Sequence, residues 1–188
     1  MSTVEKLIRF ITRIGVDPAD DPDTRLQKTL MVLCSVPFSV AGLAWGGMYF
    51  WLGVPVAGSI PFGYAVLSII SLVLFGLTRR YPWFRGSQLL LILFLPFFLM
   101  IALGGFFASS AVIVWSVICP LGAMLFDKPK NALRWFLAYL ALLGISGFIE
   151  PDAADPVSLP RLAIDILFVL NLGAVSGIIF FMVYYFVH

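Results

Sequence analysis

The side chains able to carry out chemistry are few in this sequence, and they do not cluster. The only histidine is the last residue, His188, and the two cysteines, Cys34 and Cys119, lie in separate apolar runs. A catalytic nucleophile needs a base within hydrogen-bond reach, and a zinc site needs closely spaced Cys and His ligands. The sequence therefore predicts no catalytic residue, no metal site, no bound cofactor and no enzyme activity in this segment.

One ionisable residue falls inside an apolar stretch. Asp165 follows Arg161 by four residues, and ionisable residues in such stretches are costly and are functional candidates by default. Asp165 either accepts hydrogen bonds at the first turn of its helix or pairs with Arg161, or it belongs to a region that binds a ligand or senses cations. We assign Trp45 and Tyr49 to the same candidate ligand or sensing region on the outer face, because all four residues are expected near that face.

A second set of candidates lies further along the same stretch. Asn171 needs a hydrogen-bond partner within a helix bundle or across a dimer, and such bonds are worth about 0.6 kcal/mol on average. Gly173 and Gly177 form a small-xxx-small pair that allows two helices to approach closely, as do Gly42 and Gly46 in the first apolar stretch. Each glycine pair packs either within one bundle or, for Gly173 and Gly177, between two copies of the last helix.

Composition places these residues in a membrane. Hydrophobic residues make up 61% of the 188 residues, charged residues 12%, and the mean hydropathy is +1.03. A soluble domain carries about 25% charged residues. The sequence therefore predicts an integral membrane protein whose first partner is the lipid bilayer.

Six apolar stretches are long enough, or nearly so, to cross a hydrocarbon core of about 30 Å as helices. The fold class that they predict is all-α, a bundle of six transmembrane helices. The expected spans are residues 29–51, 54–77, 87–106, 110–126, 132–149 and 162–187. Pro37, Pro61, Pro96 and Pro120 fall within them and either shape a cavity or only loosen the packing.

The basic residues predict how the bundle is oriented. Of the 12 Lys and Arg residues, all but Arg161 fall in the N-terminal segment or in the second and fourth connections. Because Lys and Arg accumulate in cytoplasmic loops, both termini are expected in the cytoplasm. This topology explains the basic residues without a nucleic-acid partner, and none is predicted.

The chain is expected to begin with a short amphipathic helix over residues 1–15. Its apolar face includes Val4, Leu7, Ile8 and Ile11, and it either lies in the membrane interface or clasps a cytoplasmic partner or second protomer. Residues 16–28 form a linker and the start of the first span, where Asp23 or Thr24 is expected as the cap. Residues 29–188 form the transmembrane domain.

Several motifs, in this order, resemble the six-span N-terminal membrane region of bacterial class III adenylate/guanylate cyclases. They cover nearly the whole chain from residue 25 onward. The motifs are RLQKTL at 25–30, AWG at 44–46, SQLLLIL at 87–93, ALGGF at 102–106, SSAV at 109–112, PLGA at 120–123, ALRWFLAYL at 132–140 and GFIEP at 147–151.

The resemblance implies a membrane anchor and receptor domain in the bacterial inner membrane. In such proteins the sixth span continues into a cytoplasmic connector and a catalytic domain, and two catalytic domains pair. The last helix here has no basic anchor, glycine cap or proline stop, so it is expected to continue in the same way. A homodimer is implied, with a lipid or small apolar molecule as a possible ligand.

Two other functions share this architecture. A small six-span substrate-binding subunit of a transporter is the main alternative, and the sensor region of a histidine kinase is another. The absence of a polar group of residues at mid-membrane counts against the transporter.

Overall fold

The computed structural model describes residue 5, residue 11 and residues 14–127, 129–149 and 160–187. Over these residues the protein is all-α. Its elements are α2 (Pro22–Trp51), α3 (Pro55–Thr78), α4 (Tyr81–Ala102), the 3₁₀ helix η1 (Val112–Val117), α5 (Ile118–Phe126), α6 (Pro129–Phe148) and α7 (Arg161–Val187).

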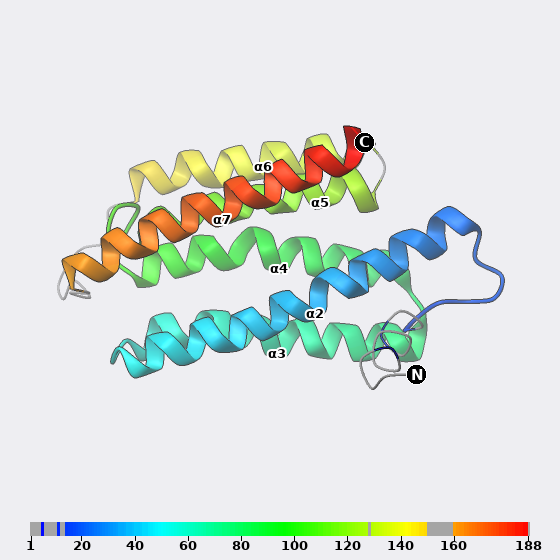
Figure 1. The fold of residues 1–188 in the computed structure, drawn as a ribbon, viewed down its shortest axis with the longest axis horizontal. Helices are drawn as coiled ribbons and strands as arrows, with labels where there is room; N and C mark the ends of the chain where they lie inside the picture. The colour runs from blue at the N-terminus through cyan, green and yellow to red at the C-terminus, as the bar shows by residue number, and fades with distance from the viewer. Residues whose placement is uncertain (1–4, 6–10, 12–13, 128, 150–159, 188) are drawn as a thin grey trace.

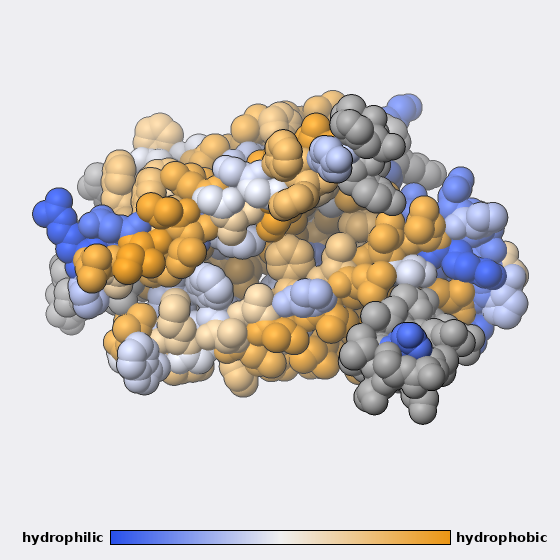
Figure 2. Space-filling model, in the orientation of Figure 1, coloured by the Kyte–Doolittle hydropathy of each residue, from blue (hydrophilic) through white to orange (hydrophobic). Residues whose placement is uncertain are grey.

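Five of these helices have the length and hydropathy of membrane spans. They are α2, α3, α4, α6 and α7, and the exposed side chains along them are mostly apolar. Figure 2 shows this as an apolar surface over the middle of the molecule, with hydrophilic residues toward its two ends. The described fold is that of a multi-pass membrane protein in contact with the lipid bilayer.

Prolines fix where several helices begin. Pro22, Pro55 and Pro82 stand in the first turns of α2, α3 and α4, where the missing N–H has no intrahelical partner to lose. Asp21 caps α2 by accepting a hydrogen bond from the Thr24 amide at 2.9 Å. The expected cap at Asp23 or Thr24 is therefore wrong, because Pro22 lets the helix start earlier.

The expected fourth span, residues 110–126, is not one continuous α-helix. Ser110 and Ala111 have positive φ values of 57° and 53°, η1 follows, and α5 begins only at Ile118. The β-branched residues of η1 are poor helix formers, and Pro120 cannot donate a backbone hydrogen bond. Together η1 and α5 extend about 25 Å by their rises per residue, less than the five long helices.

The helices run alternately up and down, so that both ends of the described chain lie at the same end of the bundle (Figure 1). Neighbours in sequence pack together: α2 on α3, α3 on α4, α4 on η1, and α5 on α6. The helix α7 packs mainly on η1. Its buried large side chains, Leu167, Asn171 and Val175, lie four residues apart on one stripe.

Buried side chains form two separate cores. The first includes Met31, Phe75, Phe84 and Cys119, near the end of the bundle that holds the termini. The second includes Tyr49, Met100, Ile113 and Leu167, near the opposite end. In α2, α3 and α4, residues between the two cores line a cavity.

Candidate functional site

A cavity of about 260 Å³ lies between the two cores. Its walls come from α2, α3, α4, η1 and α7, and we call it the central cavity. On the face where α2 and α7 lie nearest the viewer, a recess is visible between them (Figure 2). The lining residues are Pro37, Phe38, Ala41, Gly42, Trp45, Pro61, Tyr64, Ile92, Leu95, Pro96, Leu99, Val112, Trp115, Asn171 and Ile178.

Each of α2, α3 and α4 contributes an interior proline to this wall: Pro37, Pro61 and Pro96. A proline removes the N–H that would bond the carbonyl four residues earlier, and its ring prevents the closest packing of the preceding turn. Three such positions at one level of the bundle account for a gap between two well-packed cores. The interpretation that the prolines shape a cavity fits this arrangement.

Few polar side chains reach the central cavity. Asn171 accepts a hydrogen bond from Trp115 Nε1 at 3.0 Å and donates one to the Ser110 carbonyl at 2.9 Å, and its side chain is buried. Tyr64 is 6% exposed, and its hydroxyl has no hydrogen-bond partner among the described residues. The amide of Asn171 and the hydroxyl of Tyr64 are the groups available to a bound molecule.

The same contacts hold α7 to the bundle. The Ser110 hydroxyl donates to the Ile164 carbonyl at 2.8 Å, one turn before Leu167. The Ser116 hydroxyl donates to the Leu93 carbonyl at 2.8 Å and so fixes η1 to α4. Buried polar groups need such partners in lipid, and the unusual backbone at Ser110 is therefore stabilised by its neighbours. The region around the break before η1 therefore forms part of the cavity wall and also provides the contacts that attach α7.

The residues predicted as an outer-face ligand region do not come together as one site. Trp45 lines the central cavity. Tyr49 is 2% exposed and belongs to the second core. Arg161 and Asp165 are both exposed, and no ion pair joins them or binds either to another described residue. Trp45 also packs against the second core, so the two aromatic residues contact the same core, whereas Arg161 and Asp165 are exposed.

The two small-xxx-small pairs have different surroundings. A Cβ atom added at Gly42 would lie 2.8 Å from the Pro61 carbonyl oxygen, and one added at Gly46 would lie 2.9 Å from the Gly58 carbonyl oxygen. These glycines let α2 approach α3 within the bundle. A Cβ atom at Gly173 or Gly177 would meet nothing within 4 Å, so the described fold leaves that face of α7 open.

A polar group that the sequence analysis missed links α2, α3 and α4 beside the first core. Ser39 Oγ lies 2.9 Å from Ser68 Oγ, which donates to Gln88 Oε1 at 3.0 Å. All three residues are buried. Gln88 Nε2 has no partner among the described groups. The only signal for this group in the sequence is Gln88, a glutamine within an apolar stretch. The two serines give no signal, because serine is common in such stretches.

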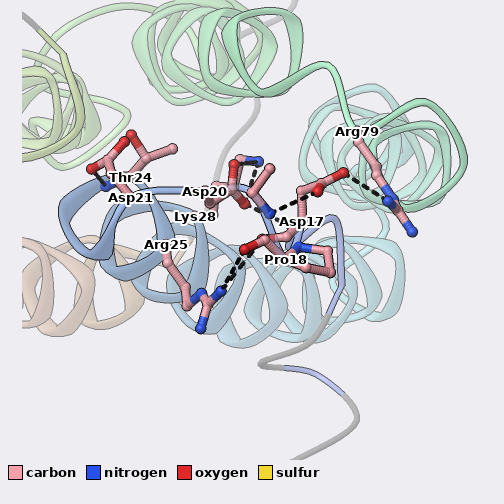
Figure 3. A network of polar contacts seen from close by, with 9 residues as sticks. Asp17, Pro18, Asp20, Asp21, Thr24, Arg25, Lys28 and Arg79 are labelled. Carbon is pink, nitrogen blue, oxygen red and sulfur yellow. Dashed lines mark hydrogen bonds and ion pairs between the residues drawn. The ribbon is translucent and has the colours of Figure 1, made fainter.

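Acidic and basic residues pair at the end of the bundle that holds the termini (Figure 3). Asp20 binds Lys28 at 2.7 Å, and Asp17 binds Arg79 at 2.8 Å. The pKa of Asp20 is lowered mainly by its hydrogen bond with Lys28, and the pKa of Asp17 by the Ala19 amide and then by Arg79. These contacts join the segment before α2 to the ends of α2 and α3.

Apolar contacts add to this attachment. Ile11 and Ile14 pack against the first core, and a Cβ atom at Gly15 would overlap the Phe75 ring. Ile11 and Ile14 are described residues of the predicted amphipathic face. Val4, Leu7 and Ile8 lie outside the described residues.

A similar pair fixes the start of α4 to the end of α5. Arg85 Nη2 lies 3.0 Å from Asp127 Oδ1, and Arg85 Nη1 donates to the Phe126 carbonyl at 3.0 Å. The cation thus satisfies a carbonyl at the C-terminus of α5, where positive charge is favourable. Within the described residues no group of three His, Cys, Asp or Glu side chains could hold a metal ion.

Comparison with known protein families, with curated proteins and with solved structures finds no match to this chain.

Proposed function

We propose that this chain is a six-span membrane domain that anchors and regulates a pair of cytoplasmic nucleotide cyclase domains. The short unit of η1 and α5 would be the fourth crossing, and both termini would lie in the cytoplasm of a bacterial cell. Support for this orientation comes from the charges: every described Lys and Arg except Arg161 lies at the end of the bundle that holds the termini. Cytoplasmic loops carry such an excess.

The observation that carries the proposal is the position of α7. This helix joins the bundle mainly through one stripe against η1, and Gly173 and Gly177 lie on an open face. It runs toward the basic end of the bundle. A helix held along one stripe keeps its other faces available to pair with the same helix of a second copy.

The cyclase assignment comes from the sequence resemblance and from no other source. Class III catalytic domains work as pairs in the proteins that the chain resembles. Two paired α7 helices would hold two such domains in register. A ligand bound to the membrane domain could then change catalysis only by favouring one arrangement of the pair over another.

A chimera tests this proposal. The chain is joined after α7, in helical register, to the connector and catalytic domain of a class III cyclase, and cyclic nucleotide formation is measured in membranes. We expect Gly173→Leu/Gly177→Leu to change the output several-fold, because bulky side chains separate the paired helices. The matched control is Gly144→Leu/Gly147→Leu on α6, where added Cβ atoms also meet nothing within 4 Å.

If the chimera is active and dimeric and both double variants give the same output, the proposed role of α7 is contradicted. A chimera that is monomeric in membranes removes the anchor function altogether.

The second candidate is a substrate-binding subunit of a transporter, and the central cavity is the observation that favours it. Soluble substrates such as vitamins need several hydrogen bonds to replace those they make with water. The cavity offers the Asn171 amide and the Tyr64 hydroxyl in otherwise apolar walls. The membrane anchor is therefore the function that we favour.

A further inference from the structure

We propose that the central cavity binds one neutral lipophilic molecule, a hydrocarbon chain with a single hydroxyl or carbonyl group, that enters from the bilayer between α2 and α7. The proposal deepens the proposed function by naming a class of ligand. Its binding step is measured on this chain alone, without a catalytic domain. Its consequence for α7 rests on the proposed function.

The central cavity opens toward the bilayer. Pro37 and Ala41 line it and are exposed, as expected for a rim rather than an enclosed void. On the other side the wall is formed by Ile178 and Asn171 of α7, a helix whose main contact is η1 and not α2. These residues lie in the middle portions of long apolar helices. The opening therefore faces lipid chains and neither aqueous phase.

The size of the central cavity suits a small lipophilic molecule. An apolar protein cavity of about 150 Å³ stays free of water and takes up benzene. The central cavity has about 260 Å³, which is room for a larger apolar body but below the range of about 300–1,000 Å³ that is usual for drug-sized ligands. This volume is enough for a single hydrocarbon chain.

Two polar side chains lie deep within the walls of the central cavity. Tyr64 is nine residues into α3 and Asn171 is ten residues into α7, which places both about 14 Å from the nearer helix start at 1.5 Å per residue. A phospholipid headgroup stays at the interface and leaves the Tyr64 hydroxyl without a partner. A small lipophile can carry its own oxygen to that depth, where it can accept from or donate to the Tyr64 hydroxyl.

Occupancy would act on the attachment of α7. Asn171 lines the cavity and holds α7 to η1 through Trp115 and to the turn before η1 through Ser110. A ligand oxygen that competes for the Asn171 amide loosens this contact, whereas one that binds Tyr64 alone strengthens the packing around it. Either change alters the position of α7 relative to η1, and α7 is the helix that would carry the signal.

Trp115 provides the measurement, because it is a wall residue. In a variant that keeps Trp115 as its only tryptophan, the chain is placed in nanodiscs and titrated with a long-chain alcohol brominated at mid-chain. We expect quenching that saturates. Ala41→Phe, which fills the rim, should abolish the saturable part, and Ala44→Phe, an exposed position on the same helix that does not line the cavity, should leave it unchanged.

Tyr64→Phe keeps the shape and should weaken the alcohol's affinity about two- to tenfold, the effect of one hydrogen bond. It also keeps the proposal testable if Ala41→Phe does not fold. Quenching that rises linearly and is the same in all variants overturns the proposal. Saturable quenching by a phospholipid brominated at the same chain positions, equal to that by the alcohol, also overturns it and assigns the cavity to bilayer lipid. Saturable binding together with an inactive chimera would support the ligand site and contradict only the proposed cyclase function.

Discussion

Lys28 is a charged residue that the fold buries, and Asp20 is its partner. Removal of one partner from a buried pair leaves a charge without compensation, which costs more than the pair contributes. We expect Asp20→Ala to lower the free energy of unfolding by about 2 kcal/mol, the scale of a hydrogen bond to a charged group. Thermal unfolding in detergent checks this.

The matched control is Asp23→Ala. Asp23 is exposed in the first turn of α2, where its interaction with the helix dipole is worth about 0.3–1 kcal/mol. Equal losses for the two variants would mean that the Asp20–Lys28 pair has no special role.

The two paired carboxylates also set a pH dependence. The pKa values of Asp17 and Asp20 are lowered from an ordinary value of 3.8, so their stabilising effect is complete above that pH and is lost as the pH falls through the lower folded-state values. These two groups should contribute nothing to the change in the thermal midpoint of unfolding between pH 7 and pH 5. When the pH is lowered below about 4, the thermal midpoint should decrease. Asp17→Asn/Asp20→Asn should flatten that fall. A fall of the same size in the double variant contradicts the assignment.

Asn171 matters for a different reason, because it joins two helices within the apolar region. Asn171→Leu removes its bonds to Trp115 and Ser110 and leaves an N–H and a carbonyl without partners. We expect a loss of about 1 kcal/mol, given an average of about 0.6 kcal/mol for each such bond. Comparison with Trp115→Phe and the double variant isolates the pair. Strictly additive losses would show that the two side chains do not interact.

At the scale of the helices, α2 and α3 depend on glycine for their close approach. An added methyl group at Gly42 would meet the Pro61 carbonyl oxygen at 2.8 Å, and backbone atoms do not move aside easily. Gly42→Ala is therefore expected to destabilise the protein by about 1–3 kcal/mol. Gly47→Ala on the same helix meets nothing within 4 Å and should be neutral or stabilising, because alanine favours the helix. Chemical denaturation of the two variants tests the difference, and similar stabilities would contradict it.

The sequence predicted the five long helices well, because their apolar length is a local property that each stretch carries by itself. It did not predict the break between α4 and α5. That break depends on Ser110, whose backbone is held by Asn171 and whose hydroxyl binds the Ile164 carbonyl. Those partners lie more than fifty residues away, and no local pattern reveals them.

At the scale of the whole molecule, the two cores leave a cavity where three prolines lie at one level. The prolines were visible in the sequence, but their common level follows from how α2, α3 and α4 align. The surroundings of the predicted ligand region follow from the same alignment: Tyr49 is buried in the second core, and Trp45, one turn earlier, packs against that core and also lines the cavity. Which side of a uniformly apolar helix faces its neighbours is not encoded by hydropathy.

In the proposed dimer, α7 is the helix that pairs with a second copy. Cysteine cross-linking in native membranes tests this claim directly, in a background without the natural thiols (Cys34→Ser, Cys119→Ala). With one cysteine introduced per chain, Gly173→Cys and Gly177→Cys should give disulfide-linked dimers, and Gly144→Cys and Gly147→Cys on α6 should not. Cross-linking on α6 equal to that on α7, or none on α7 at any concentration of oxidant, would contradict the account.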